Sequence, residues 1–429
     1  MPISNVRLYW NRSISISLFV ETLPLNVFEK IRQFLHFNDN SLLVPRNEPG
    51  HDRMHKIRPV IETIRKRFNS IPVEERVACD EQMCSSKARH FLIRYMPKKP
   101  NKYGFILYLL SGMSGFSYNF EVYTGQEGEE ERLPNEPDIG ATGNTVVRLT
   151  RILKPHQNHK IYFDNYYTSI SLCDYLLSQG VHCVGTVRTD RIPDCPLPDK
   201  KTQKSMVRGQ SVEYVGEMKN GKIAAVSWKD NKCVNLLSTF AGVEPETKVR
   251  RYDRSRKLHV EVNCPSIISE YNRHMGGVDL LDSLLGRYKI IQRSKKWYIR
   301  LFYHLLDLTV VNAWLIYVRV HKERQEPHLK LAMFRLQLAQ SLCKFGMTTT
   351  PTRGRPSLAS KKPKKAVACS GPPKEVRLDN IGHWPDHTEK KQRCKMEQCK
   401  GFTVIKCVKC TVPLCLNKTN NCFVKYHTL

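Results

Sequence analysis

Seven residues near the C-terminus have side chains that could hold metal ions. They are Cys394, Cys399, Cys407, Cys410, Cys415, Cys422 and His427. Thiolates and imidazoles at this spacing are typical ligands of tetrahedral Zn²⁺, and the short spacing of Cys407 and Cys410 suits one ion. Either His383 or His387 would bring the set to eight ligands, which is enough for about two zinc ions whose ligand pairs could interleave as a cross-brace.

Disulfide bonds are the alternative use for these cysteines. They fit the rest of the chain poorly, because no secretory signal opens the sequence and the other cysteines are scattered between Cys79 and Cys369 without a framework spacing. We therefore expect free thiols in the body of the protein and zinc at its C-terminus. A tail of fewer than about 50 residues builds little core, so bound metal would supply much of its folding free energy.

Aspartates at the ends of expected elements form a second group. Asp80 lies in a strand-like run, Asp164 ends another, and Asp279 lies in the first turn of a leucine-rich helix after a glycine pair, with Asp282 on the same helix face. Carboxylates from separate elements repel one another unless a cation lies between them, and oxygen ligands suit Mg²⁺ or Mn²⁺. Two such ions can clamp the attacking and leaving oxygens of a phosphoryl transfer. The alternative is that each is an ordinary turn or helix-start residue.

The net charge indicates an anionic partner. The chain has 69 Lys and Arg against 40 Asp and Glu, a formal charge of +29, and nucleic-acid phosphate is the commonest polyanion that such an excess meets. A membrane surface is the competing anion, but the sequence has no lipidation motif. Its most apolar run, residues 301–318, carries His304, Asp307 and Asn312, which is typical of a buried helix in a soluble protein. We expect a DNA partner and no membrane.

Hydrophobic periodicity predicts helices near both ends of the main part of the chain and mixed strands and helices between them, which indicates an α/β fold. Apolar residues recur at helical spacing in 25–37 and 57–68, whereas 76–83 and 159–169 resemble strands. This pattern divides the chain into a discontinuous helical domain (1–75 and 283–345), a mixed α/β domain (76–282) with an insertion at about 191–265, a disordered basic linker (346–382) and the cysteine-rich, zinc-binding domain (383–429).

The linker contains two basic motifs. Arg353 and Arg355 belong to an Arg-Gly-Arg-Pro run that would fit a narrow A·T minor groove, although a plain basic tether is the alternative. A second motif favours nuclear import, or simply more phosphate binding. Its residues are Lys361, Lys362, Lys364 and Lys365. We expect a nuclear protein.

Five motifs occur in an order that resembles the piggyBac transposase family. They are DEQM (80–83), YFDNYYTS (162–169), GTVRTDR (185–191), WKDNKCVNLLSTF (228–240) and YNRHMGGVDLLD (271–282). The resemblance runs from about residue 34 to the C-terminus. It implies that 76–282 is an RNase H-like catalytic core and that the helical domain of 1–75 and 283–345 serves dimerisation and DNA binding. It also implies cut-and-paste transposition at TTAA sites with a catalytic Mg²⁺ or Mn²⁺.

The resemblance also assigns roles to residues and partners. The metal-binding DDD triad would fall on Asp80, Asp164 and Asp279, with Asp282 as a further aspartate near the metal. The cysteine-rich tail would bind the transposon end, unless it reads protein as RING- or PHD-like domains do. The expected partners are double-stranded DNA (transposon ends and TTAA targets), a second copy in a homodimer, and possible chromatin proteins.

The chain departs from the family pattern in one loop. Where the family has a sequence close to VPFKGR, residues 84–89 read CSSKAR. We also expect that the chain lacks the longer N-terminal region usual in active transposases. Two functions therefore remain open: an active transposase, and a DNA- or chromatin-binding descendant that has lost cleavage.

Overall fold

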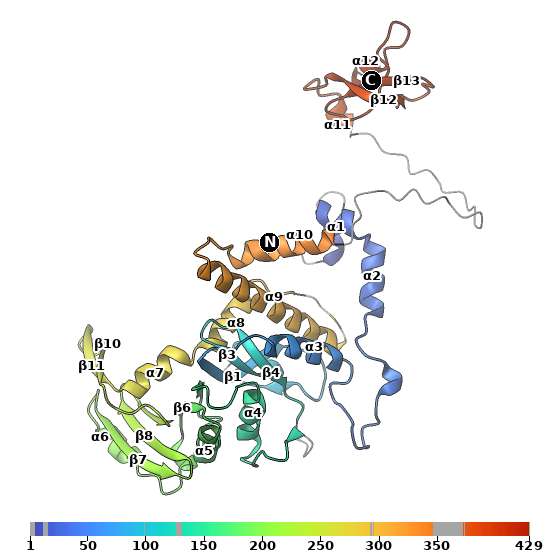
Figure 1. Ribbon diagram of the computed structural model, residues 1–429. Helices are drawn as coiled ribbons and strands as arrows, with labels where there is room; N and C mark the ends of the chain where they lie inside the picture. The colour runs from blue at the N-terminus through green and yellow to red at the C-terminus, as the bar shows by residue number, and fades with distance from the viewer. Residues whose placement is uncertain are drawn as a thin grey trace. The chain divides into compact units, whose positions relative to one another are not determined.

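The computed structural model divides into two compact units, Met1–Met347 and Thr348–Leu429 (Figure 1). It describes residues 5–11, 16–97, 99–125, 131–291, 294, 296–345, 372 and 374–428. The expected DNA-binding residues of the linker lie outside these ranges; they are Arg353, Arg355, Lys361, Lys362, Lys364 and Lys365.

A nine-stranded sheet forms the centre of the larger unit. Its order is β2-β3-β1-β5-β6-β9-β8-β7, and β4 pairs with β3. The strands are β1 (Arg76–Ser85), β2 (Arg94–Tyr95), β3 (Tyr103–Gly112), β4 (Ser117–Val122), β5 (Lys160–Phe163), β6 (His182–Thr186), β7 (Ser211–Met218), β8 (Gly221–Lys229) and β9 (Cys233–Ser238). The strands expected at 76–83 and 159–169 are confirmed as β1 and β5, and the mixed α/β fold is confirmed with them.

Helices cover both faces of this sheet (Figure 1). The α-helices are α1 (Ser17–Thr22), α2 (Leu25–Phe34), α3 (Arg58–Asn69), α4 (Ala141–Thr150), α5 (Ile170–Ser178), α6 (Lys200–Ser205), α7 (Ser266–His274), α8 (Gly277–Arg287), α9 (Trp297–Glu323) and α10 (Leu331–Lys344). The 3₁₀ helices are η1 (Val6–Trp10), η2 (Asn40–Leu42) and η4 (Thr189–Arg191). Along β3 the side chains alternate: Leu107 and Leu109 pack with α3, α8 and α9, whereas Leu110 packs with α4 and α5.

Part of the expected insertion (about 191–265) extends the main sheet. Strand β9 pairs with β6, so β7, β8 and β9 continue the central sheet instead of forming a separate lobe. The rest of the segment is a hairpin of β10 (Thr247–Asp253) and β11 (Leu258–Cys264), which pair only with each other. Helix α7 then returns the chain to the sheet.

Helix α9 is the described helix that is long and apolar enough to cross a membrane by length and composition. Its buried polar side chains nevertheless have partners inside the protein. His304 contacts Gln82, Asp307 accepts from Arg335, and Asn312 bonds to the backbone of Ser117. Because its polar groups are satisfied by the sheet and by α10, α9 has the contacts of a core helix.

The smaller unit has little regular structure. Its elements are α11 (Lys374–Arg377), β12 (Pro385–Arg393), β13 (Phe402–Cys407) and α12 (Cys422–Thr428). Helix α11 lies inside the segment expected to be a disordered linker, so the ordered part begins upstream of residue 383. The hydrophobic cluster of this unit consists of Cys394, Cys407, Cys410, Leu414, Cys415, Cys422, Phe423 and Tyr426. Cysteines thus take the place of much of the apolar core.

Candidate metal centres

Two of the expected metal-binding aspartates lie side by side on neighbouring parallel strands, Asp80 within β1 and Asp164 directly after the end of β5. In the pairing of β1 with β5, Cys79 lies opposite Phe163. Asp80 and Asp164 are the next residues of the two strands, so the parallel register alone brings them together at the carboxyl edge of the sheet. Beyond this point β5 ends, and the Tyr166 N–H donates to Asp164 at 2.8 Å.

Helix α8 brings the other two aspartates to the same edge. Its first residue, Gly277, lies so close to β3 that a Cβ atom there would be 2.5 Å from the carbonyl oxygen of Gly112. This contact explains one glycine of the Gly276–Gly277 pair, since a Cβ on Gly276 would meet nothing within 4 Å. One turn into α8, Asp282 accepts a hydrogen bond of 2.6 Å from Gln82 of β1.

Tyr271 of α7 reports the proximity of the three triad aspartates. Burial raises the pKa of Tyr271 to about 12, and the charges of Asp164, Asp80 and Asp279 act in the same direction. One partly buried ring is thus within electrostatic reach of residues from β1, β5 and α8.

Negative charge accumulates at this edge. Burial raises the pKa of Asp164, and the neighbouring Asp80 adds to the shift against the Tyr166 N–H. Burial also raises the pKa of Asp282 to about 6, although the Gln82 hydrogen bond opposes it. Such shifts mean that the ionised carboxylates are under-compensated by the protein, which is the condition that a bound cation relieves.

Lys99 is a fixed cation beside these carboxylates. Its Nζ donates to the carbonyl oxygen of Glu81 at 2.8 Å, and its charge lowers the pKa of both Asp164 and Asp282. In the described part of the chain, the aspartates do not form a group whose ligand atoms all lie within 4.8 Å of one another. They line one edge instead of forming a closed cage.

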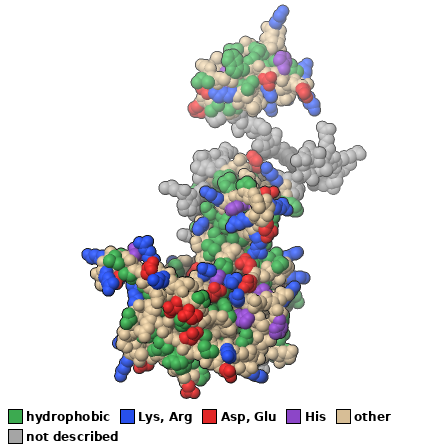
Figure 2. Space-filling model, turned by 60° about the vertical axis from the view of Figure 1, so that its left-hand side comes forward, with side chains coloured by type: hydrophobic (Ala, Val, Ile, Leu, Met, Phe, Trp, Pro, Cys, Tyr) green, Lys and Arg blue, Asp and Glu red, His purple; other side chains and the backbone are tan. Residues whose placement is uncertain are grey.

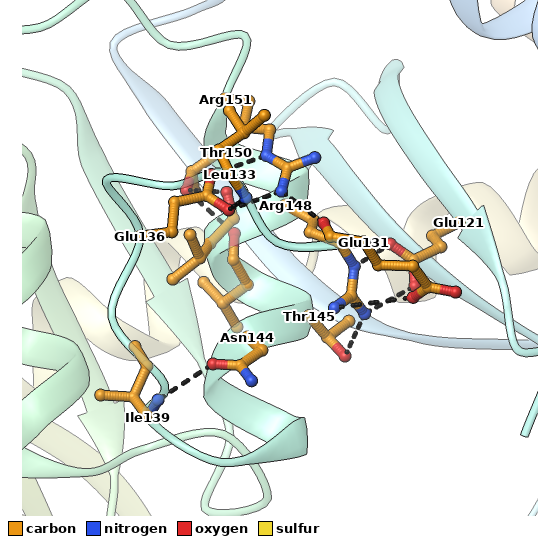
Figure 3. Close-up of polar contacts among 12 residues, drawn as sticks. Glu121, Glu131, Leu133, Glu136, Ile139, Asn144, Thr145, Arg148, Thr150 and Arg151 are labelled. Carbon is orange, nitrogen blue, oxygen red and sulfur yellow. Dashed lines mark hydrogen bonds and ion pairs between the residues drawn. The ribbon is translucent and has the colours of Figure 1, made fainter. Parts of the chain in front are cut away.

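An ion-pair network joins α4 to β4 and to the loop that precedes α4 (Figure 3). Arg148 of α4 is almost fully buried and donates to both carboxylate oxygens of Glu121 in β4, at 2.7 and 2.8 Å. Arg151 holds Glu136 at 2.5 Å, which ties the preceding loop to α4. Arg148 also lines a cavity of about 490 Å³ together with Tyr166, two residues after Asp164.

Sequence reasoning did not identify Lys99, Gln82, His304 or the Arg148–Glu121 pair. Gln82 belongs to the DEQM motif, and that was the available signal for it. The others come from segments far apart in the chain, and a single sequence carries no mark of such pairings.

The cysteine and histidine residues of the smaller unit form two groups. His383, Cys407, Cys410 and His427 make one, and Cys394, Cys399, Cys415 and Cys422 make the other. Within each group the possible ligand atoms all lie within 4.8 Å of one another. Chain order alternates between the groups in the interleaved manner expected, and either group could hold a metal ion. His387 belongs to neither, so His383 is the eighth residue.

Both histidines are oriented as metal ligands usually are. His383 Nδ1 lies 3.4 Å from the Sγ atoms of Cys407 and Cys410, while its Nε2 lies 3.0 Å from an Asp379 carboxylate oxygen. His427 Nε2 lies 3.4 Å from Cys410 Sγ, and its Nδ1 contacts the Phe423 carbonyl at 2.8 Å. A second partner of this kind fixes the tautomer and leaves the other nitrogen for a metal.

The second group depends on a glycine. A Cβ on Gly401 would lie 2.9 Å from Cys415 Sγ and 3.4 Å from Cys399 Sγ. The fourteen cysteines that the structure describes are free, so none of them is held by a disulfide.

Comparisons with known proteins agree with this architecture. A family model described as Transposase IS4 matches residues 1–314. The human PiggyBac transposable element-derived protein 3 is 29% identical over 98% of this chain, and the human derived protein 2 is 29% identical over 91% of it. The chain spans 66% and 62% of the lengths of these two relatives.

A solved structure shares the fold. It is a cryo-EM structure of a piggyBac transposase synaptic complex with hairpin DNA, with a TM-score of 0.63 and 20% sequence identity, and the match covers 95% of this chain and 82% of that one. On the match of the family model to most of the chain, this protein belongs to the Transposase IS4 family, as a member of its piggyBac type.

Proposed function

We propose that this protein is a piggyBac-type DDD transposase that cleaves DNA and transfers strands at TTAA sites in a metal-dependent reaction. The observation that carries the proposal is the register of β1 and β5, which sets Asp80 beside Asp164 at the edge that α8 supplies with Asp279. Helix α7 completes this edge with Tyr271.

The catalytic core would be RNase H-like. Strands β4, β3 and β1 are antiparallel neighbours, and β5 and β6 follow in parallel with β1, giving the order β4-β3-β1-β5-β6. An RNase H-like fold has this order and these directions. Such a fold has acidic residues on the first and the fourth of its five strands, counted along the chain. Here these strands are β1, which carries Asp80, and β5, which Asp164 follows.

Asp80, Asp164 and Asp279 would hold Mg²⁺ or Mn²⁺, with Asp282 beside them. The residues fit such an ion because they offer carboxylate oxygens, and because burial leaves Asp164 and Asp282 with raised pKa values. Bound metal would supply activation of the attacking oxygen and stabilisation of the leaving oxygen. The protein would contribute position: Gln82 orients Asp282, and Lys99 offers a cation for a DNA phosphate.

The smaller unit would bind two Zn²⁺ ions, and in this zinc-bound form it would bind the transposon end. Thiolate and imidazole ligands in two sets of four suit tetrahedral zinc, and the contacts of His383 and His427 orient one ring nitrogen toward their group. Zinc would also replace the missing apolar core.

The remaining partners follow from charge and exposure. The +29 net charge supports binding to double-stranded DNA in the nucleus. A homodimer is supported by α2, where Val27, Ile31 and Phe34 are exposed, since apolar helix faces of this kind mark interaction sites. Chromatin proteins are possible partners of the zinc-binding unit.

A nicking assay on a TTAA-flanked duplex tests the proposal. The wild-type chain should nick it with Mg²⁺ or Mn²⁺ and not with a chelator, and Asp80→Asn, Asp164→Asn or Asp279→Asn should each abolish nicking. Asp194→Asn is the matched control, because Asp194 is exposed and has a positive φ of 45° that asparagine tolerates. Tight DNA binding without nicking would instead favour a DNA- or chromatin-binding descendant.

A further inference from the structure

The β10–β11 hairpin is strongly basic. Residues 247–261 contain six Lys or Arg against two acidic residues; the basic ones are Lys248, Arg250, Arg251, Arg254, Arg256 and Lys257. In Figure 1 the hairpin extends away from the main sheet, and in Figure 2 a lobe that projects at the left of the view carries several Lys and Arg side chains. Packing against the core does not explain why this two-stranded ribbon carries so many basic side chains.

One face of the hairpin holds it to the core. Val249, Val260 and Val262 pack in or against the cluster that contains Trp228, and the Trp228 indole N–H donates to the Asn263 carbonyl at 2.8 Å. Arg251 reaches Asp230 in the turn between β8 and β9 at 3.1 Å. The base of the hairpin is therefore fixed.

The opposite face and the turn present cations to solvent. By the alternation of a strand, Lys248, Arg250 and Tyr252 share the outer face of β10, and all three are exposed. Lys248 pairs with Glu261 at 3.6 Å. Among the described residues, Arg250 and the turn residues Arg254, Arg256 and Lys257 form no ion pair.

Asp253 shapes the turn, and its single negative charge lies beside Arg256 among three cations. Asp253 accepts the backbone N–H groups of Ser255 at 2.9 Å and Arg256 at 3.2 Å. Its carboxylate is used to close the turn, which holds the backbone between the three cations in one conformation. Fixed backbone lowers the ordering cost when such a turn binds a partner.

A cavity lies between this hairpin and helix α7. It has a volume of about 400 Å³ and is lined by Arg251 of β10, Trp228 of β8 and Tyr271 of α7. Tyr271 is the ring that senses the charges of Asp80, Asp164 and Asp279. Arg251 of the hairpin and Tyr271, the ring beside the candidate site, therefore line the same cavity.

We propose that the outer face and turn of the β10–β11 hairpin bind the sugar-phosphate backbone of duplex DNA engaged at the carboxylate edge. The inference rests on the proposed function. A two-stranded ribbon is the width that a DNA groove admits, and seven residues of strand extend roughly 23 Å, or about seven base-pair steps. Cations without ion-pair partners are attracted to phosphates by charge, and such contacts do not distinguish one base sequence from another.

The test uses the full chain with Arg254, Arg256 and Lys257 all changed to alanine. Affinity for duplex DNA should fall by about tenfold or more near physiological salt, and the slope of log K against log salt should become less steep by about 2 to 3. The double variant Arg254→Lys, Arg256→Lys should retain most of the affinity, because a phosphate interacts with the positive charge that lysine preserves.

The matched control removes the same charge elsewhere. Lys200, Lys201 and Lys204 of α6 are exposed and form no ion pair among the described residues, so their change to alanine should leave the salt slope nearly unchanged. Equal losses in both triple variants, or no loss in the hairpin variant, would overturn the inference. If the wild-type chain nicks DNA and the hairpin variant binds and nicks equally well, only this inference fails. If the wild-type chain does not bind duplex DNA, the proposed function fails with it.

Discussion

Gln82 of β1 donates a hydrogen bond of 2.6 Å to Asp282 of α8 and contacts His304 of α9 at 2.7 Å through its other side-chain atom. One amide thus joins the strand that carries Asp80 to two helices. Gln82 and His304 are both buried, so the hydrogen-bonded series His304–Gln82–Asp282 has few other partners available, and each member depends on its neighbour for a hydrogen bond.

Replacing Gln82 tests this connection. Gln82→Met keeps the volume but leaves buried polar groups on Asp282 and His304 unsatisfied, so the free energy of unfolding should fall by about 1 to 3 kcal/mol and nicking should fall with it. Denaturant unfolding and the nicking assay measure the two effects. Gln33→Met on the exposed surface of α2 is the control and should change neither. A fully stable and fully active Gln82→Met variant would contradict the positioning role.

His304 predicts a pH dependence of stability. Burial lowers its pKa from 6.5 to about 3, so the folded protein keeps the ring neutral where the unfolded chain takes up a proton. The unfolded state therefore binds more protons between those values, and stability should fall as the pH falls from about 6.5 toward 3. Urea unfolding at several pH values should show a weaker dependence in His304→Gln. An identical dependence in both proteins would assign the effect to other groups.

Gly277 should be far less tolerant of alanine than its neighbour. A Cβ at Gly277 would lie 2.5 Å from the Gly112 carbonyl oxygen, so α8 must move away from β3 and take Asp279 with it. Overpacking of this kind costs about 1 to 3 kcal/mol. Gly276→Ala is the control, because that site is open. Thermal unfolding and nicking should separate the variants; equal behaviour would mean that the close approach is unimportant.

Metal analysis can assign the eighth zinc ligand. His383→Ala should lower bound zinc from about two ions per chain to about one, because one complete set of four ligands remains. His387→Ala should retain both ions, since His387 is exposed on β12 and outside both groups. The same loss from both variants would mean that the groups are arranged differently when metal is bound.

Arg148 should be important for stability despite its distance from the chemistry. Arg148→Ala leaves Glu121 without its bidentate partner in a largely buried setting, which costs about 3 to 5 kcal/mol. Arg132→Ala removes an ion pair with the exposed Asp138 and should change the free energy of unfolding much less, because water screens that pair. Urea unfolding of the two variants measures the difference. Similar small losses would show that water compensates Glu121.

The sequence by itself determined the local elements and the chemistry of the ligands. Short apolar runs, residues 77–79 and 161–163, indicate the strands before Asp80 and Asp164, because a strand in the middle of a covered sheet is buried on both faces. The spacing of Cys407 and Cys410 likewise indicated zinc, because these properties depend only on neighbours in the chain.

Only the tertiary structure decided which distant groups meet. It brought Gln82 to His304 and Asp282, chose His383 over His387, and gave Gly277 a role that Gly276 lacks. It also left the apolar stripe of α2 exposed, where helical periodicity would suggest a buried face. Each outcome depends on the approach of elements tens to hundreds of residues apart, and a local pattern contains no information about that approach.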